Sequence, residues 1–123
     1  MQDLRVRTKQ YALRIVRLYT ALPKSTEAQV LGQQVLRSGT SVAANYREAS
    51  RARSDAEFIS KLGIVEQELD ETMMWLELLV EAEIVKEGKL TELIDESDQL
   101  LRITVTSIKN TKLRRKPKQS KRT

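Results

Sequence analysis

Polar residues recur at steps of three and four in the middle of the chain, a spacing that stacks side chains on one face of a helix. The members of this stripe are Arg37, Ser41, Asn45 and Glu48. Acids further along the chain, among them Glu68 and Glu71, could face the stripe from a second helix. Such a group could hold a ligand or a metal ion, or it could be a buried layer of hydrogen bonds that fixes how two helices align. We favour the layer, because di-metal carboxylate bundles use Glu-x-x-His pairs and the chain has no histidine.

The sequence offers no catalytic nucleophile with a partner. Its serines have no histidine to activate them, and the absence of cysteine excludes disulfides and thiolate metal ligands. The glycines, at positions 32, 39, 63 and 88, are too scattered to form a phosphate-binding loop. We therefore expect no enzymatic activity, no cofactor and no metal ion.

Positive charge is concentrated at the C-terminal end, where 112–123 holds seven bases and no acid. These bases are Lys112, Arg114, Arg115, Lys116, Lys118, Lys121 and Arg122. They could contact the phosphates of a nucleic acid, or they could serve only to keep the chain soluble. Further bases near the N-terminus favour nucleic acid slightly, namely Arg5, Arg7, Arg14 and Arg17. The C-terminal bases have no aromatic residue beside them, so we expect no stacking on bases and no sequence-specific recognition.

The elements that would position these residues are predicted to be helices. Hydrophobic residues make up 40% of the 123-residue chain and aromatic residues only 4%, a balance typical of an all-α bundle. Apolar residues at steps of three and four, together with candidate N-caps at Ser25 and Ser54, predict four helices. Their approximate ranges are 2–22, 26–51, 55–87 and 90–112. Gly88 is the predicted stop of the third helix.

Short connections between these helices predict one domain, an antiparallel up-down-up-down four-helix bundle over 1–112. Because 114–123 contains no apolar residue, we expect 113–123 to be a disordered basic tail. No apolar run approaches the roughly 20 residues of a membrane span, and the N-terminus lacks a signal-peptide core, so we expect a cytoplasmic protein without membrane contact.

The third helix carries two apolar stripes. One of them includes Leu62, Leu69 and Leu76 and would face the core. The other includes Ile64, Trp75 and Leu78 and points to another side, which predicts an interface with a second chain. The alternative is that Trp75 closes the edge of the bundle's own core.

The stretch RSGTSVAANYREASRARSDAEFISKLGIVEQELDETMMWLELL strongly resembles the bacterial four-helix-bundle family first noticed in intervening sequences of 23S ribosomal RNA genes. The similarity extends from about Asp3 to Ile108. This resemblance implies an antiparallel four-helix fold and a ring-like homopentamer. It also implies a relative, the accessory variability protein of diversity-generating retroelements, which is a basic pentameric bundle that binds RNA and a reverse transcriptase. The family has no catalytic residues to carry over.

The chain departs from the family pattern at three positions. Arg7 stands where many members have an aromatic residue, Ala43 where they have proline, and Ala49 where glycine is frequent. These differences imply a straighter second helix and a branch distinct from the ribosomal inserts. The residues that match the family's recurrent pattern are assigned by the resemblance to structure or assembly: Arg37, Asn45, Glu48, Arg51, Arg53, Phe58, Glu68, Glu71 and Trp75.

Taken together, the sequence predicts a non-enzymatic, self-assembling bundle that is an RNA-associated scaffold or accessory factor. The alternative is a module that binds another protein, such as a reverse transcriptase, without touching nucleic acid.

Overall fold

Residues 3–120 of the backbone are described by a computed structural model, with side chains described as far as Arg115. The predicted phosphate contacts Lys121 and Arg122 lie outside the described residues, and the side chains of Lys116 and Lys118 lie outside the described side chains.

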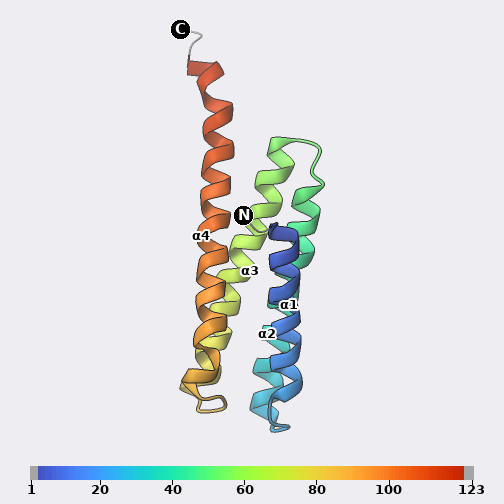
Figure 1. Ribbon diagram of the computed structural model, residues 1–123, viewed down its shortest axis with the longest axis vertical. Coiled ribbons are helices and arrows are strands. Elements are labelled where there is room, and N and C mark those ends of the chain that lie inside the picture. Colours follow the sequence, from blue (N-terminus) through green and yellow to red (C-terminus); the bar gives the residue numbers. More distant parts are fainter. Residues whose placement is uncertain (1–2, 121–123) are drawn as a thin grey trace.

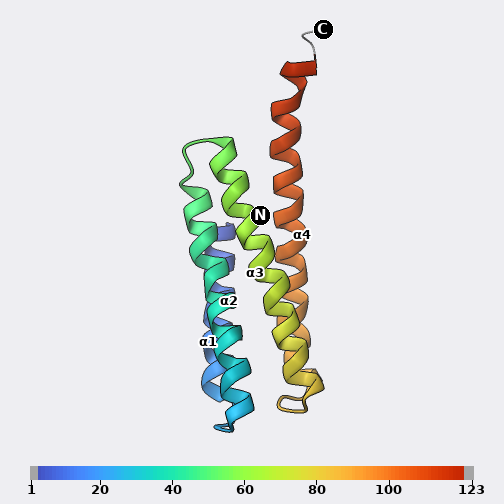
Figure 2. The same ribbon diagram turned by 180° about the vertical axis from the view of Figure 1, so that it is seen from behind.

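Four helices form the molecule: α1 (Leu4–Ala21), α2 (Thr26–Ser50), α3 (Asp55–Glu81) and α4 (Glu87–Ser120). Successive helices run antiparallel, and α4 continues well beyond the end of the other three (Figures 1 and 2). Each helix packs along its neighbour in the chain, while α1 meets α4 over a much smaller contact. In the described part of the chain no Cα atom of α1 lies within 8 Å of a Cα atom of α3, so the two helices occupy diagonal corners. The predicted all-α, up-down-up-down bundle is confirmed.

Short polar side chains begin three of the helices. Asp3 caps α1 by accepting a 2.8 Å hydrogen bond from the Arg5 backbone N–H, and this bond is the main reason that the pKa of Asp3 is lowered. Ser25 accepts from the Ala28 N–H at the start of α2, and Ser54 accepts from the Glu57 N–H at the start of α3. The two predicted serine caps are confirmed, because the capping bond is local and can be read from the sequence.

The predicted end of the third helix is wrong by six residues, since α3 ends at Glu81 and not at 87. The Ile84 N–H donates to the Leu79 carbonyl at 3.0 Å, and the Glu83 N–H donates to the Val80 carbonyl at 2.9 Å. This pair of bonds is a Schellman motif, which needs a residue with positive φ. Glu83 supplies it with φ 61°, although glycine is the usual residue there. Gly88 lies in the first turn of α4 and does not terminate the third helix.

The fourth helix also differs from its predicted range, since it begins at Glu87 and extends to Ser120 instead of spanning 90–112. Basic residues such as those after Thr111 are good helix formers even where no core is available to them. The loss of apolar residues after Leu113 therefore marks the end of packing and not the end of the helix. Leu113 itself is half exposed.

The core lies along the bundle axis and receives the predicted stripe of α3, with Leu62, Leu69 and Leu76 at most 1% exposed. Burying each such leucine contributes on the order of 2 kcal/mol. Gly39 allows α1 to approach α2 closely, because a Cβ at this position would lie 2.7 Å from Cγ1 of Ile15. Helix α2 runs without a break through this glycine, as predicted.

Within the described residues, no helix is both long enough and apolar enough to cross a membrane.

Candidate nucleic-acid interface

Two hydrogen-bonded pairs of hydroxyl groups lie inside the bundle, and each joins two helices. Tyr11 of α1 and Ser97 of α4 have their oxygens 2.6 Å apart, and Thr72 of α3 donates to Ser38 of α2 at 2.8 Å. All four residues are at most 1% exposed. The Ser97 hydroxyl donates to the Leu93 carbonyl one turn earlier, so the Tyr11 hydroxyl is the donor in its pair.

Burial raises the pKa of Tyr11 to about 12, and hydrogen bonds with Ser97 and Thr72 oppose part of that rise. The phenol therefore stays protonated and available as a donor throughout the neutral range. These hydroxyls form the buried polar layer of the bundle. Sequence reasoning placed Ser38 and Ser97 on the inward stripes of their helices but missed Thr72, whose signal is a short hydroxyl side chain at a core position.

The polar layer predicted from the sequence lies instead at the surface, along the seam between α2 and α3, and it divides into three separate groups. Arg37 forms ion pairs with Glu68, at 3.3 Å, and with Glu71, and its side chain is half exposed. Glu71 also accepts a 3.2 Å hydrogen bond from Trp75 Nε1. The buried layer predicted for these residues is thus corrected to a solvated seam, since a helix surface keeps long charged side chains near water.

The other members of the predicted layer find partners close by. Asn45 donates to the backbone carbonyl and hydroxyl of Ser41 at 2.9 and 2.8 Å, all within α2. Glu48 forms a 2.7 Å ion pair with Lys61 of α3, and this hydrogen bond is the main cause of the raised pKa of Lys61. Glu48 therefore binds a different cation from Glu68 and Glu71, which both pair with Arg37. No cluster of three potential metal ligands occurs among the described residues.

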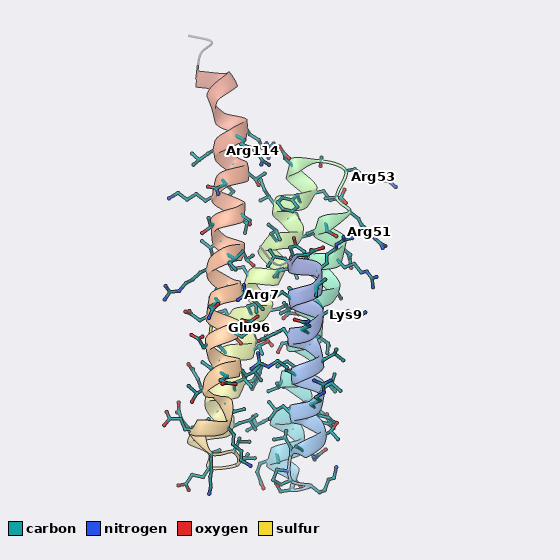
Figure 3. All side chains as sticks on the ribbon, viewed as in Figure 1. Arg7, Lys9, Arg51, Arg53, Glu96 and Arg114 are labelled. Carbon is teal, nitrogen blue, oxygen red and sulfur yellow. The ribbon has the colours of Figure 1, made fainter. Side chains whose placement is uncertain are left out.

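Arg7, one of the three departures from the family pattern, joins α1 to α4. Its Nε and Nη2 donate to the two carboxylate oxygens of Glu96, both at 2.8 Å, and Nη2 also reaches Gln99 (Figure 3). The side chains of Arg7 and Glu96 are only 21% and 18% exposed, and the hydrogen bond to Glu96 raises the pKa of Arg7. The predicted phosphate contact at Arg7 is corrected, because its guanidinium is occupied by an acid of the same chain.

The remaining arginines predicted on the first helix divide between its two ends. Arg5 pairs with Asp3 at 3.3 Å on the surface. Arg14 and Arg17 line a groove between α1 and the start of α4, which is also lined by Lys86 from the preceding turn and by Lys89 from the first turn of α4. The groove measures about 550 Å³, has an apolar floor that includes Leu18, Leu22 and Leu90, and no acid lines it.

A second set of cations gathers where α2 passes into α3 and α4 runs alongside. We call Arg47, Arg51, Arg53 and Arg114 the basic end, and Figure 3 labels the last three. All four are exposed, and the first three form no ion pair within the described side chains. Arg114 is 4.0 Å from Asp55, at the limit of an ion pair between exposed groups. Arg53, Asp55 and Arg114 line an open hollow of about 360 Å³.

Two further predicted contacts on α4, Lys112 and Arg115, are also exposed, and Lys112 lines a separate hollow that includes Glu66 and Lys109. Lys9 and Arg47 share a further hollow between α1 and α2. Sequence reasoning assigned Arg51 and Arg53 to structure or assembly and did not single out Arg47. Their common signal is a basic residue at or beyond the last turn of a helix, a position that also suits the helix dipole.

Of the three residues predicted to form an interface, Ile64 and Leu78 are each 36% exposed on the outer side of α3. Trp75 is half-buried against the core and points toward the seam with α2. Met74, which the sequence reasoning did not select, is 43% exposed.

Fold and surface together define a small antiparallel four-helix bundle with a basic end. The chain belongs to the 23S rRNA-intervening sequence protein family, whose sequence model matches residues 2–106. It is also similar to a protein of unknown function from the S23 ribosomal protein family of Bacteroides thetaiotaomicron. That likeness has 37% identity and a TM-score of 0.82 and covers 87% of this chain and 99% of the other. No curated protein matches the chain.

The predicted family membership is thereby confirmed. The relation to the accessory proteins of retroelements, the pentamer and the RNA partner stay predictions.

Proposed function

We propose that the protein is a non-enzymatic, self-associating bundle that binds the phosphate backbone of RNA at its basic end. The observation that carries this proposal is the presence of Arg47, Arg51 and Arg53, which are exposed and form no ion pair within the described side chains. An unpaired guanidinium is free to donate two parallel hydrogen bonds to a phosphate.

Nearby acids do not cancel these charges. Asp3 is paired with Arg5, and Glu48 with Lys61, so each of these carboxylates has a cation of its own. Asp55 lies beside Arg114. The basic end therefore keeps a positive field that would attract a polyanion and increase its rate of association.

The contacts at this end suit the backbone of RNA better than its bases. The aromatic side chains nearest the basic end, Tyr46 and Phe58, are half-buried against the core, and Phe58 lines the open hollow beside Arg53 and Arg114. The four arginines offer more contacts to phosphates than these rings offer to bases. Binding should therefore be largely independent of sequence and strongly dependent on salt. Four phosphate contacts on a single strand correspond to a log–log salt slope of about −3.

A triple variant with Arg47→Gln, Arg51→Gln and Arg53→Gln tests the site. Its control carries Arg17→Gln, Lys24→Gln and Lys86→Gln, which remove the same charge from the opposite end of the bundle. Fluorescence anisotropy with a labelled single strand and a labelled hairpin, at two salt concentrations, gives affinities and slopes.

We expect the basic-end variant to lose at least about tenfold in affinity at low salt and to reduce the magnitude of the salt slope by about 2. The control should change both quantities much less. Equal losses in the two variants would mean that only total charge matters, and unchanged binding in the basic-end variant would overturn the site. Circular dichroism checks that both variants remain folded.

The groove between α1 and the turn into α4 favours a second candidate function, the binding of an acidic protein segment. Four cations around an apolar floor fit a peptide that carries both carboxylates and apolar side chains. A partner retained from lysate after nuclease treatment should then be lost on Arg14→Gln with Lys89→Gln and kept by the basic-end variant. Loss on the basic-end variant alone would count against the groove.

A further inference from the structure

Every helix of the bundle exposes at least one large apolar side chain, and α1 and α3 expose three each. On α1 these are Val6, Leu13 and Val16, each at least 40% exposed. Their spacing of seven and three residues places them on one side of the helix, which we call the α1 outer face. On α3 they are Ile64, Met74 and Leu78, each at least 36% exposed and also on one side, which we call the α3 outer face.

These two faces cannot cover each other within one chain. Helices α1 and α3 occupy diagonal corners of the bundle and meet only through buried side chains such as Tyr11 and Thr72 among the described residues. Each turns its buried stripe inward, with Ile15 on α1 and Leu69 on α3 fully buried. The outer faces therefore point in opposite directions, and only another molecule can bury them.

The two faces carry opposite charge. Helix α1 contains five bases and no acid, and exposed Lys9 and Arg17 flank its outer face. Helix α3 contains eight acids and one base, and exposed Asp70 and Glu77 flank its outer face. Contact between two α1 faces or two α3 faces would bring like charges together, whereas contact between an α1 face and an α3 face brings opposite charges together.

We infer that the α1 outer face of one copy of this chain binds the α3 outer face of a second copy. This inference rests on the self-association included in the proposed function and names the surface that the α3 face meets. Such a contact is heterologous, because each copy uses a different surface on each side. Every added copy leaves one α1 face and one α3 face open until the assembly closes on itself.

Two variants, each with one face disabled, test the pairing. One carries Leu13→Glu and Val16→Glu, and the other carries Met74→Glu and Leu78→Glu. Both disabled faces are acidic, so they do not attract each other. All four positions are exposed, and circular dichroism checks folding. Light scattering on nuclease-treated protein measures mass for the wild type, for each variant alone and for the equimolar mixture.

We expect the wild type to form assemblies larger than a dimer and each variant alone to stay at the 14.1 kDa monomer mass. The mixture should form a one-to-one heterodimer and nothing larger, because only one intact α1 face and one intact α3 face remain in each pair. The substitutions should weaken self-association at least about tenfold.

Other results overturn the inference in recognisable ways. If the variant in α1 alone still dimerises, the α3 faces bind each other. If the mixture forms no heterodimer, the two faces do not pair. A monomeric wild type would remove self-association itself, while RNA binding at the basic end, which is measured separately, could still hold.

Discussion

Helix α1 packs against two neighbours by different means. Toward α2 it fits against glycines, with Ile15 over Gly39 and Tyr19 and Leu22 over Gly32. Toward α4 it is joined by polar side chains, the Arg7 ion pair with Glu96 and the buried hydrogen bond of Tyr11. The junction between α1 and α2 depends on glycines that let the two helices pack closely. The junction between α1 and α4 depends on long side chains that span a wider separation.

The difference explains where the open surface of the bundle lies. Close packing at the glycines leaves little room between α1 and α2 around Ile15. The wider junction with α4 leaves the cation-lined groove of about 550 Å³ beyond Tyr11. The polar contacts between α1 and α4 therefore close the bundle while leaving a surface available to a partner. Substitutions at the two junctions should change the stability of the protein by different amounts and with different pH dependence.

Gly39→Val should have the largest effect on stability. The new side chain would meet Ile15, which is fully buried and cannot move aside. We expect the free energy of unfolding to fall by about 3 kcal/mol, measured by urea denaturation. The control is Gly63→Ala, since a Cβ at this helical position meets nothing within 4 Å. It should stabilise the protein by about 0.5 to 1 kcal/mol. A neutral Gly39→Val would show that α1 and α2 are not closely packed.

Stability should decline between pH 10 and pH 12 because of Tyr11, whose pKa is raised to about 12 in the folded protein. Above pH 10 the unfolded chain loses the phenol proton while the folded chain keeps it, so the unfolded state binds fewer protons and gains stability with pH. The expected loss approaches about 2 kcal/mol near pH 12.

Tyr11→Phe isolates this contribution to the polar junction. At neutral pH the variant should lose about 1 kcal/mol with the hydrogen bond to Ser97. The advantage of the wild type over the variant, measured by denaturation at several pH values, should then shrink as the pH rises above 10. A constant advantage from pH 8 to pH 12 would contradict the raised pKa.

Arg7 and Glu96 should show a coupling energy of about 1 to 2 kcal/mol in a double-mutant cycle with Arg7→Gln and Glu96→Gln. The pair is bidentate and mostly shielded from solvent, which favours a measurable interaction. A matched cycle on Arg102 and Asp98, whose side chains are 80% and 43% exposed, should give only about 0.3 to 0.5 kcal/mol. Equal coupling in the two cycles would show that the α1 and α4 junction does not depend on Arg7.

The smallest effect is expected at the seam between α2 and α3. Arg37→Gln should cost less than about 1 kcal/mol in thermal or urea denaturation, because the arginine is half exposed and its ion pairs are screened. A loss as large as that of Gly39→Val would mean that this seam holds the bundle together as strongly as packing does.

The sequence was sufficient for the features that depend on local rules. The stripe through Leu62, Leu69 and Leu76 predicted burial correctly, because periodicity decides which side of a helix meets the core. Ser25 and Ser54 were identified as caps for the same local reason. The end of α3 was misplaced because Glu83 takes a backbone conformation that glycine usually supplies, and side-chain type gives no sign of this.

Long-range pairing was the part that the sequence could not supply. Arg7 and Glu96 are 89 residues apart, and nothing near Arg7 distinguishes an internal ion pair from a phosphate contact. The buried pair of Ser38 and Thr72 has the same difficulty, since a hydroxyl on an inward stripe has no identifiable partner until the facing helix is placed. The basic end likewise appears only once the last turn of α2 and the distant Arg114 are placed at the same end of the bundle.

Hydrogen exchange with and without a short single-stranded RNA would test the central claim most directly. We predict that bound RNA slows exchange in peptides covering 44–56 and 109–115, where the basic end lies, and leaves peptides covering 78–92 unchanged. Protection centred on 78–92, or bound RNA without any protection at the basic end, would contradict the account.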